Sequence, residues 1–98
     1  MEVKSVREEK KITIYPIGHV DALSADGLQV RLSGALEGIE ELIFDCKDVK
    51  YLSSAGLRLL LFAQKTMDHQ GKMTLVNVPE VVRLFIEISG FDAFINIE

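Results

Sequence analysis

The stretch that decides the fold of this chain is Tyr51-Leu52-Ser53-Ser54-Ala55-Gly56-Leu57-Arg58-Leu59-Leu60-Leu61. Two adjacent serines follow an apolar segment and precede a strongly apolar run, which predicts a helix that begins at the serines. At a helix N-terminus the backbone N–H groups lack intrahelical acceptors, and the helix dipole is positive. One of the two serines therefore either caps this helix or occupies a position that favours a phosphate group.

The segments around the serine pair alternate between strand and helix patterns. In order, we expect strands at Val3–Val6 and Ile12–Ile17, a helix from Ser24 to Gly38, a strand at Leu42–Phe44, a polar loop from Asp45 to Lys50, a helix from Ala55 to His69, a strand at Met73–Val78, a helix from Pro79 to Gly90, and a last short strand or apolar tail with Phe94, Ile95 and Ile97. The continuous apolar run Leu42–Phe44 is typical of a strand buried on both faces. Leu57, Leu60 and Leu61 are expected to pack the following helix onto the sheet.

Three local features refine these expectations. Ser24 is a candidate N-cap for the first helix. Pro16 lacks an N–H donor, so the second strand is expected to be bulged or to leave that side unpaired. The helix after Pro79 is expected to bury one face, made of Val81, Leu84, Phe85 and Ile88.

The alternation of strands and helices predicts an α/β fold, a single domain over residues 1–98 with a mixed four- to five-stranded sheet and three or more helices. In such folds, functional loops gather at the carboxyl ends of the strands. The loop from Gly18 to Ala22 and the loop from Asp45 to Ser54 should therefore meet at one edge of the sheet.

Composition excludes several classes of function. The net charge is −4 and no basic stripe is present, so we expect neither nucleic acid nor a membrane surface as a partner. Cys46 is the only cysteine and ends an apolar run, which indicates a buried, inert thiol. The charged N-terminal residues do not resemble a signal peptide, so a cytoplasmic location is expected.

Three segments, in order, resemble the STAS domain, the sulfate-transporter and anti-sigma-antagonist family. They are Gly18-His19-Val20-Asp21, then Leu42-Ile43-Phe44-Asp45 through Tyr51-Leu52-Ser53-Ser54-Ala55-Gly56-Leu57, and finally Val82-Arg83-Leu84-Phe85 with Ser89-Gly90-Phe91. The middle segment is similar to the family's Ser-Ser-Ala-Gly-Leu signature, and the resemblance covers nearly the whole chain. The length of the chain resembles the anti-anti-sigma factors more than the transporter-attached domains.

The resemblance implies an anti-sigma factor antagonist that acts by partner switching. The unphosphorylated protein would bind an anti-sigma factor that is also a serine kinase, and phosphorylation would release it until a serine phosphatase resets it. Ser54 aligns with the phosphoacceptor, and Ser53, which replaces an aspartate of many members, is the second choice. The implied partner-binding residues are His19, Val20, Asp21, Ser53, Ser54, Ala55, Gly56, Leu57 and Arg58.

Other hypotheses about the function remain open beside the partner-switching antagonist. A STAS module that does not switch would act as a subunit of a larger complex, of a lipid-transport or stress-sensing type. A hydrolase could use Ser54, His19 and Asp21 as nucleophile, base and orienting residue, but the G-x-S-x-G motif is absent, so no enzymatic activity is expected. The two histidines and one cysteine show no ligand spacing, so neither a metal nor a cofactor is expected.

Overall fold

The computed structural model describes residues 2–98. In chain order the elements are β1 (Glu2–Glu8), β2 (Lys11–Val20), α1 (Ala22–Ala35), β3 (Glu41–Asp45), β4 (Val49–Leu52), α2 (Ser54–Asp68), β5 (Lys72–Val76), α3 (Glu80–Ile88) and the short 3-10 helix η1 (Phe91–Ala93). The described residues thus form an α/β structure with a five-stranded mixed sheet and three α-helices. The predicted fold class is confirmed.

The sheet is built around the long strand β2. Its order is β1-β2-β3-β5, and β4 pairs with the far end of β2. The β1–β2 hairpin is antiparallel and the other pairings are parallel. Pro16 lies between the part of β2 that pairs with β3 and the part that pairs with β4. The expected bulge is present two residues later, between Gly18 and His19, where Gly18 has a φ of 96°.

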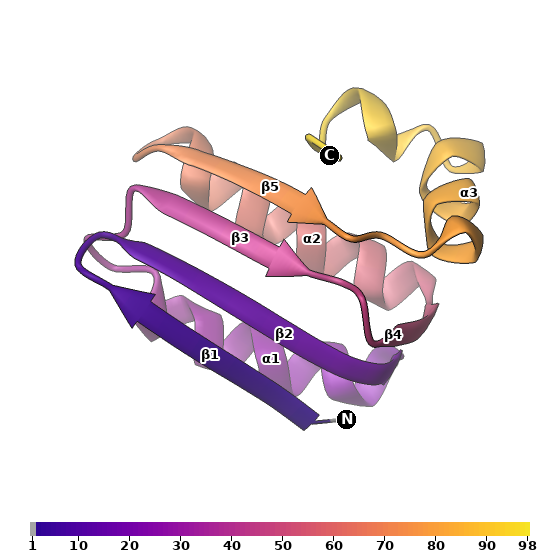
Figure 1. Cartoon of the computed structure of the whole chain (residues 1–98), viewed down its shortest axis with the longest axis horizontal. Coiled ribbons are helices and arrows are strands. Elements are labelled where there is room, and N and C mark those ends of the chain that lie inside the picture. The colour runs from indigo at the N-terminus through magenta and orange to yellow at the C-terminus, as the bar shows by residue number, and fades with distance from the viewer. Residues whose placement is uncertain (1) are drawn as a thin grey trace.

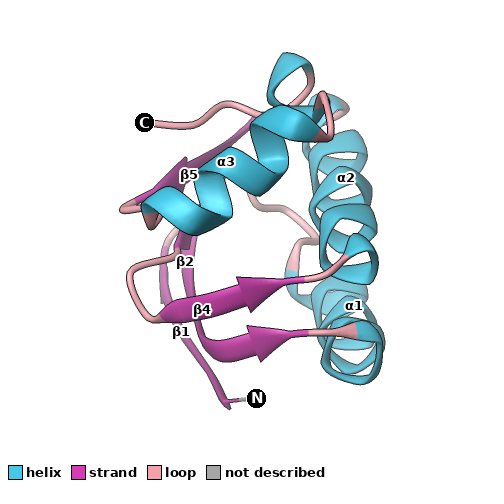
Figure 2. Ribbon diagram, turned by 90° about the vertical axis from the view of Figure 1, so that its right-hand side faces the viewer, coloured by secondary structure: helices cyan, strands magenta, loops and turns pink. Residues whose placement is uncertain are grey.

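Helices α1 and α2 lie side by side on one face of the sheet, and α3 lies at one end of it (Figures 1 and 2). In β3, Leu42 and Phe44 are fully buried, whereas Ile43 points the other way and is only half-buried. The expectation that this strand is buried on both faces is therefore wrong, because α1 and α2 both pack on the same face. Successive strand side chains alternate between faces.

The core lies between the sheet and the two helices. Its buried residues include Ile12, Ile14, Leu28, Leu32, Leu42, Phe44, Leu57, Leu59, Leu60, Ala63, Met67, Met73 and Leu75. Leu57 and Leu60 are buried as expected, and Leu61 is half-buried against this cluster.

The strand β4 replaces part of the predicted polar loop. Only Val49 and Leu52 are buried in it, and the two residues between them are exposed. Four residues with this pattern carry no recognisable period, so sequence reasoning missed the strand. The expected last strand is reduced to a single parallel bridge between Leu75 and Ile97.

The third helix buries a different face from the one expected. Val82 and Ile86 line the same internal apolar space as Phe44 and Leu75, so they hold α3 against the end of the sheet. Three of the residues predicted for the core, Val81, Leu84 and Ile88, are exposed instead, and Phe85 is half-buried. Because α3 has apolar residues on two faces, its sequence pattern did not decide which face packs.

Candidate functional site

The N-termini of α1 and α2 lie side by side at one edge of the sheet. His19 pairs with Tyr51 and Val20 with Leu52 in parallel register at the ends of β2 and β4. Asp21, which follows Val20, is the N-cap of α1, and Ser53, which follows Leu52, is the N-cap of α2. The two loops predicted to meet are therefore adjacent, although residues 18–20 belong to β2 and residues 49–52 to β4.

The hydroxyl of Ser53 forms two hydrogen bonds. Its hydroxyl accepts from the backbone N–H of Gly56 at 3.2 Å, which caps α2, and donates to the carbonyl oxygen of Val20 at 3.0 Å. The backbone N–H of Ser53 also donates to that same carbonyl at 2.9 Å. Ser53 thus joins the start of α2 to the end of β2, and its half-buried hydroxyl has a structural role.

Ser54 is the first residue of α2 and is exposed. Within residues 2–98 its hydroxyl forms no hydrogen bond, in contrast to that of Ser53. Arg58 follows one turn later and is also exposed. The position combines an accessible hydroxyl with the positive end of a 15-residue helix whose first turn contains no acidic residue.

The residues between Ser54 and Arg58 hold α2 in place. Ala55 is half-buried, and Gly56 and Leu57 are buried. A Cβ at position 56 would lie 2.5 Å from Leu52 Cδ1 and 3.0 Å from the carbonyl oxygen of Val20. A side chain at position 56 would therefore push the end of the Leu52 side chain aside and crowd the carbonyl of Val20, so Gly56 suits the close approach of α2 to the strand ends.

Asp21 and Ser24 form a capping box at the start of α1. The Asp21 carboxylate accepts from the Ser24 backbone N–H at 3.1 Å, and the Ser24 hydroxyl accepts from the Asp21 N–H at 3.0 Å. The expected N-cap role of Ser24 is corrected, because Ser24 lies at the third helical position and Asp21 is the cap. The backbone hydrogen bond from Ser24, followed by that from its hydroxyl, lowers the pKa of Asp21 below its ordinary value.

Tyr51 is a neighbour of the site that sequence reasoning did not select. Its ring packs against that of His19 with centroids 5.8 Å apart and an interplanar angle of 56°. Both residues are exposed, and Tyr51 remains 50% accessible. Recognising β4 as a strand parallel to β2 would have placed Tyr51 beside His19.

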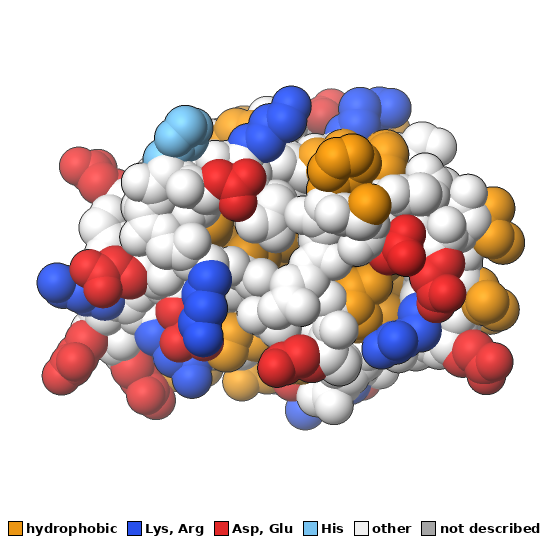
Figure 3. Space-filling view, turned by 90° about the horizontal axis from the view of Figure 1, so that it is seen from above, with side chains coloured by type: hydrophobic (Ala, Val, Ile, Leu, Met, Phe, Trp, Pro, Cys, Tyr) orange, Lys and Arg blue, Asp and Glu red, His pale blue; other side chains and the backbone are white. Residues whose placement is uncertain are grey.

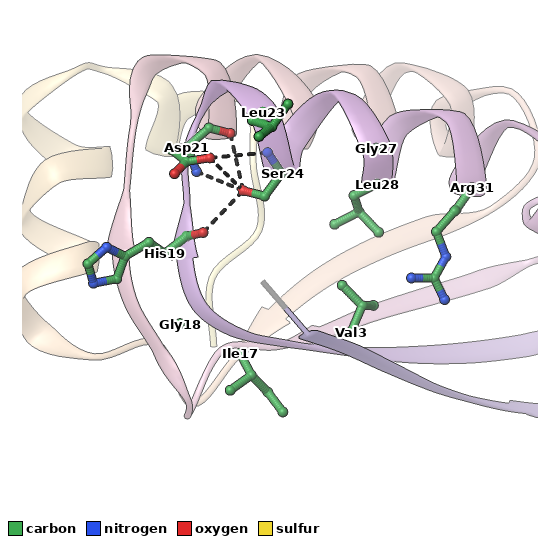
Figure 4. A pocket seen from close by; sticks show the side chains of 10 residues that line it. All are labelled: Val3, Ile17, Gly18, His19, Asp21, Leu23, Ser24, Gly27, Leu28 and Arg31. Atoms are coloured by element: carbon green, nitrogen blue, oxygen red, sulfur yellow. Dashed lines mark hydrogen bonds between the residues drawn. The ribbon is translucent and has the colours of Figure 1, made fainter.

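An open groove of ≈ 560 Å³ adjoins the site on the α1 side. Its lining residues are Val3, Ile17, Gly18, His19, Asp21, Leu23, Ser24, Gly27, Leu28 and Arg31. Figure 4 shows the His19 ring pointing away from the other lining side chains, and the Asp21 carboxylate engaged with Ser24. The groove shares His19 and Asp21 with the candidate site, but neither serine of the pair lines it.

The arrangement does not build the hydrolase constellation considered from sequence. The Asp21 carboxylate is bonded to Ser24, and the His19 ring packs on Tyr51, so these two side chains do not form a base and its orienting partner. Among the described residues, no group of three or more His, Cys, Asp and Glu side chains is placed to hold a metal ion. No helix in residues 2–98 has the length and apolarity needed to cross a bilayer.

The sequence profile of the STAS domain matches residues 3–98. The chain belongs to the STAS domain family. It is 34% identical over 76 residues to BtrV of Bordetella bronchiseptica, which is classed as an anti-sigma factor antagonist. That match covers 76% of this chain and 66% of BtrV, which is slightly less than two thirds of the relative's length.

Solved structures share the STAS fold at low sequence identity. The anti-sigma factor antagonist SpoIIAA in its unphosphorylated form has a TM-score of 0.86 at 17% identity, over 99% of this chain and 88% of SpoIIAA. The phosphorylated form of SpoIIAA, a Bacillus cell fate determinant, has a TM-score of 0.78 at 16% identity, over 99% and 91% of the two chains. An anti-sigma factor antagonist from Mycobacterium paratuberculosis has a TM-score of 0.83 at 17% identity, over 98% and 85%.

Proposed function

We propose that this STAS domain is an anti-sigma factor antagonist switched by phosphorylation of Ser54. While unphosphorylated it binds an anti-sigma factor that is also a serine kinase, and this binding makes a sigma factor available. Phosphorylation releases the complex, and a serine phosphatase restores the binding form. The observation that carries the proposal is the free, exposed hydroxyl of Ser54 at the N-terminus of α2.

The geometry favours Ser54 over Ser53 as the phosphoacceptor. Phosphorylation of Ser53 would remove the hydrogen bond that its hydroxyl donates to Val20 and would place a bulky dianion at a half-buried cap. Ser54 loses no hydrogen bond when its hydroxyl is esterified. Ser53 remains the second choice, because it lies only one residue away and is partly accessible.

The same position explains how a phosphate can release a partner without unfolding the domain. A phosphoserine carries about −1.5 to −2 charges near neutral pH. The positive end of α2 favours that charge locally, whereas a partner packed on the site would have to desolvate it. SpoIIAA, which shares this fold, is described in both unphosphorylated and phosphorylated forms.

The proposed contact surface consists of the exposed residues around the two helix starts. They are His19, Asp21, Ser54 and Arg58, with Ser53 and Ala55 half-buried among them. Val20, Gly56 and Leu57 are buried and act by holding the exposed residues in position. The protein supplies a docking surface and a substrate serine, and it needs no catalytic residue or cofactor of its own. A cytoplasmic site of action is part of the proposal.

Incubation with the cognate anti-sigma kinase and ATP tests the proposal, with intact mass and titration calorimetry as readouts. Wild type is expected to gain one phosphate and to lose affinity for the kinase. Ser54→Ala is expected to bind the kinase and to stay unmodified. Ser54→Asp is expected to fold and to bind weakly, although one carboxylate only partly imitates a phosphate dianion.

Ser53→Ala is the matched control and should still accept a phosphate. Loss of the phosphate in Ser53→Ala, but not in Ser54→Ala, would move the site by one residue. If wild type neither binds such a kinase nor gains a phosphate, a STAS module that does not switch becomes the better account.

A further inference from the structure

The helix α3 has an apolar surface wider than the part that it buries. One face, with Val82 and Ile86, is buried against the end of the sheet. The other carries Val81, Leu84 and Ile88 at intervals of three and four residues, so these side chains form one continuous stripe over two helical turns. A helix that is apolar beyond its buried face is expected to pack against something else.

The outer stripe is open to solvent in the isolated chain. Val81 is 68% exposed, Leu84 48% and Ile88 83%. Figure 3 shows apolar side chains at the end of the molecule where α3 lies, with acidic and basic side chains beside them. Exposed apolar side chains that are contiguous, rather than scattered singly, mark interaction sites.

Acidic residues flank this stripe on one side. Glu80 and Glu87 lie one turn before and one turn after Leu84 on the adjoining face of the helix, and both are exposed. Arg83 lies three residues after Glu80 and four before Glu87, within one helical turn of each. The ion pairs found among the described residues, Lys10–Glu40 and Lys72–Glu41, nevertheless include neither glutamate. The stripe therefore has an acidic rim, with Arg83 behind it, and neither glutamate of this rim is held in an ion pair among the described residues.

The acidic rim argues against a second copy of this chain as the occupant. If two copies packed their α3 stripes against each other in antiparallel orientation, the residues that immediately precede Val81 and Ile88 would face each other across the contact. Glu80 of one copy would then meet Glu87 of the other, and like charges at such positions are destabilising. The net charge of −4 adds a longer-range repulsion between copies.

We propose that the outer stripe of α3 docks an amphipathic helix of a partner protein whose apolar face is bordered by lysine or arginine. Apolar side chains of that helix pack on Val81, Leu84 and Ile88, and its basic residues pair with Glu80 and Glu87. α3 contacts β4, the strand that leads into the serine pair, so this surface lies beside the site proposed for phosphorylation but does not depend on it.

A synthetic helical peptide with leucine at the a and d positions and lysine at the e and g positions is a direct probe. Added to the ¹⁵N-labelled domain, this peptide is expected to shift the amide signals of α3. A second peptide with glutamate in place of lysine is expected to bind with an affinity at least about tenfold lower. The double variant Leu84→Ser/Ile88→Ser should weaken binding of the lysine peptide by about tenfold or more. The double variant Glu80→Lys/Glu87→Lys should reverse the preference between the two peptides.

Leu23→Ser/Val30→Ser is the matched control, because these α1 residues are 86% and 76% exposed but lie outside the stripe. It should bind the lysine peptide like wild type. Signal shifts located away from α3, equal binding of both peptides, or no binding at millimolar concentration would each overturn the proposal. A dimer in sedimentation equilibrium that Ile88→Ser dissociates would also overturn it, because a second copy would then be the occupant.

Discussion

The hydroxyls of Ser53 and Ser54 differ in what they contact, although the residues are neighbours. Ser53 caps α2 and reaches across to the carbonyl oxygen of Val20, whereas Ser54 begins the helix with an exposed side chain. Ser53 thus helps to hold the fold, and Ser54 is the phosphoacceptor that we propose. Substitutions at the two positions should separate these roles.

Ser53→Ala is expected to lower the free energy of unfolding by about 0.5–2 kcal/mol, because it removes the N-cap bond to Gly56 and the bond to Val20. Ser54→Ala should change it by less than about 0.5 kcal/mol, since its hydroxyl has no partner to lose. Urea unfolding of both variants measures the difference. A larger loss for Ser54→Ala than for Ser53→Ala would contradict this assignment of the cap.

Gly56→Ala is expected to destabilise the domain by about 1–3 kcal/mol, because the added Cβ would overlap the end of the Leu52 side chain and crowd the carbonyl oxygen of Val20. Gly27→Ala is the control: it lies within α1 with open space around its Cβ position. That variant should stabilise by about 0.5–1 kcal/mol through helix propensity. Thermal unfolding of the pair checks both signs, and a stabilised Gly56→Ala would show that α2 does not need this close approach.

At the scale of the element, each of α1 and α2 begins directly after a strand of the same parallel pair. The caps Asp21 and Ser53 therefore occupy equivalent places in two strand-to-helix connections. Only Asp21 is ionisable, so the start of α1 is sensitive to pH in a way that the start of α2 is not.

The lowered pKa of Asp21 predicts a loss of stability in acid. Its folded pKa lies below the unfolded value, so its contribution is present above about pH 3.9 and is lost as the pH falls through the folded pKa. A carboxyl carbon NMR titration should give a midpoint below the ordinary value for Asp21. Asp21→Asn should lose part of the acid dependence of unfolding, and a midpoint at or above the ordinary value would count against the capping box.

At the scale of the whole molecule, the core extends from the helix layer to Cys46 at the end of β3. Burial, and to a smaller extent the neighbouring Asp45 charge, raise the pKa of its thiol to about 12. The folded pKa of Cys46 lies above the unfolded value of a thiol. The stability gained by burying the neutral thiol is therefore complete below about pH 8.5 and is lost as the pH rises toward 12.

Cys46 should therefore react with a thiol reagent at pH 8 only when the domain opens. The expected rate in native buffer is far below that in urea, and it should rise in the destabilised Gly56→Ala variant in proportion to its unfolded population. Absorbance of the released chromophore measures both rates. Fast labelling of the native wild type would show that the strand end is open to solvent.

The sequence by itself determined those features that rest on local periodicity and local chemistry. The alternation of strands and helices, the start of α2 at the serine pair and the burial of Leu57 and Leu60 follow from apolar spacing and helix-start signals. The family signature rests on the same short segments. The end of α3 is equally local, because Gly90, two residues after Ile88, has a φ of 78° that does not continue a right-handed helix.

Only the tertiary structure decided the features that depend on distant partners. The four residues of β4 form a strand because β2 offers a parallel edge beyond Pro16. The inner face of α3 is chosen by the apolar space that Val82 and Ile86 fill, not by its own pattern. The difference between the two serines depends on the carbonyl of Val20, 33 residues from Ser53 in the chain. This carbonyl accepts a hydrogen bond from the hydroxyl of Ser53, whereas the side chain of Ser54 is exposed.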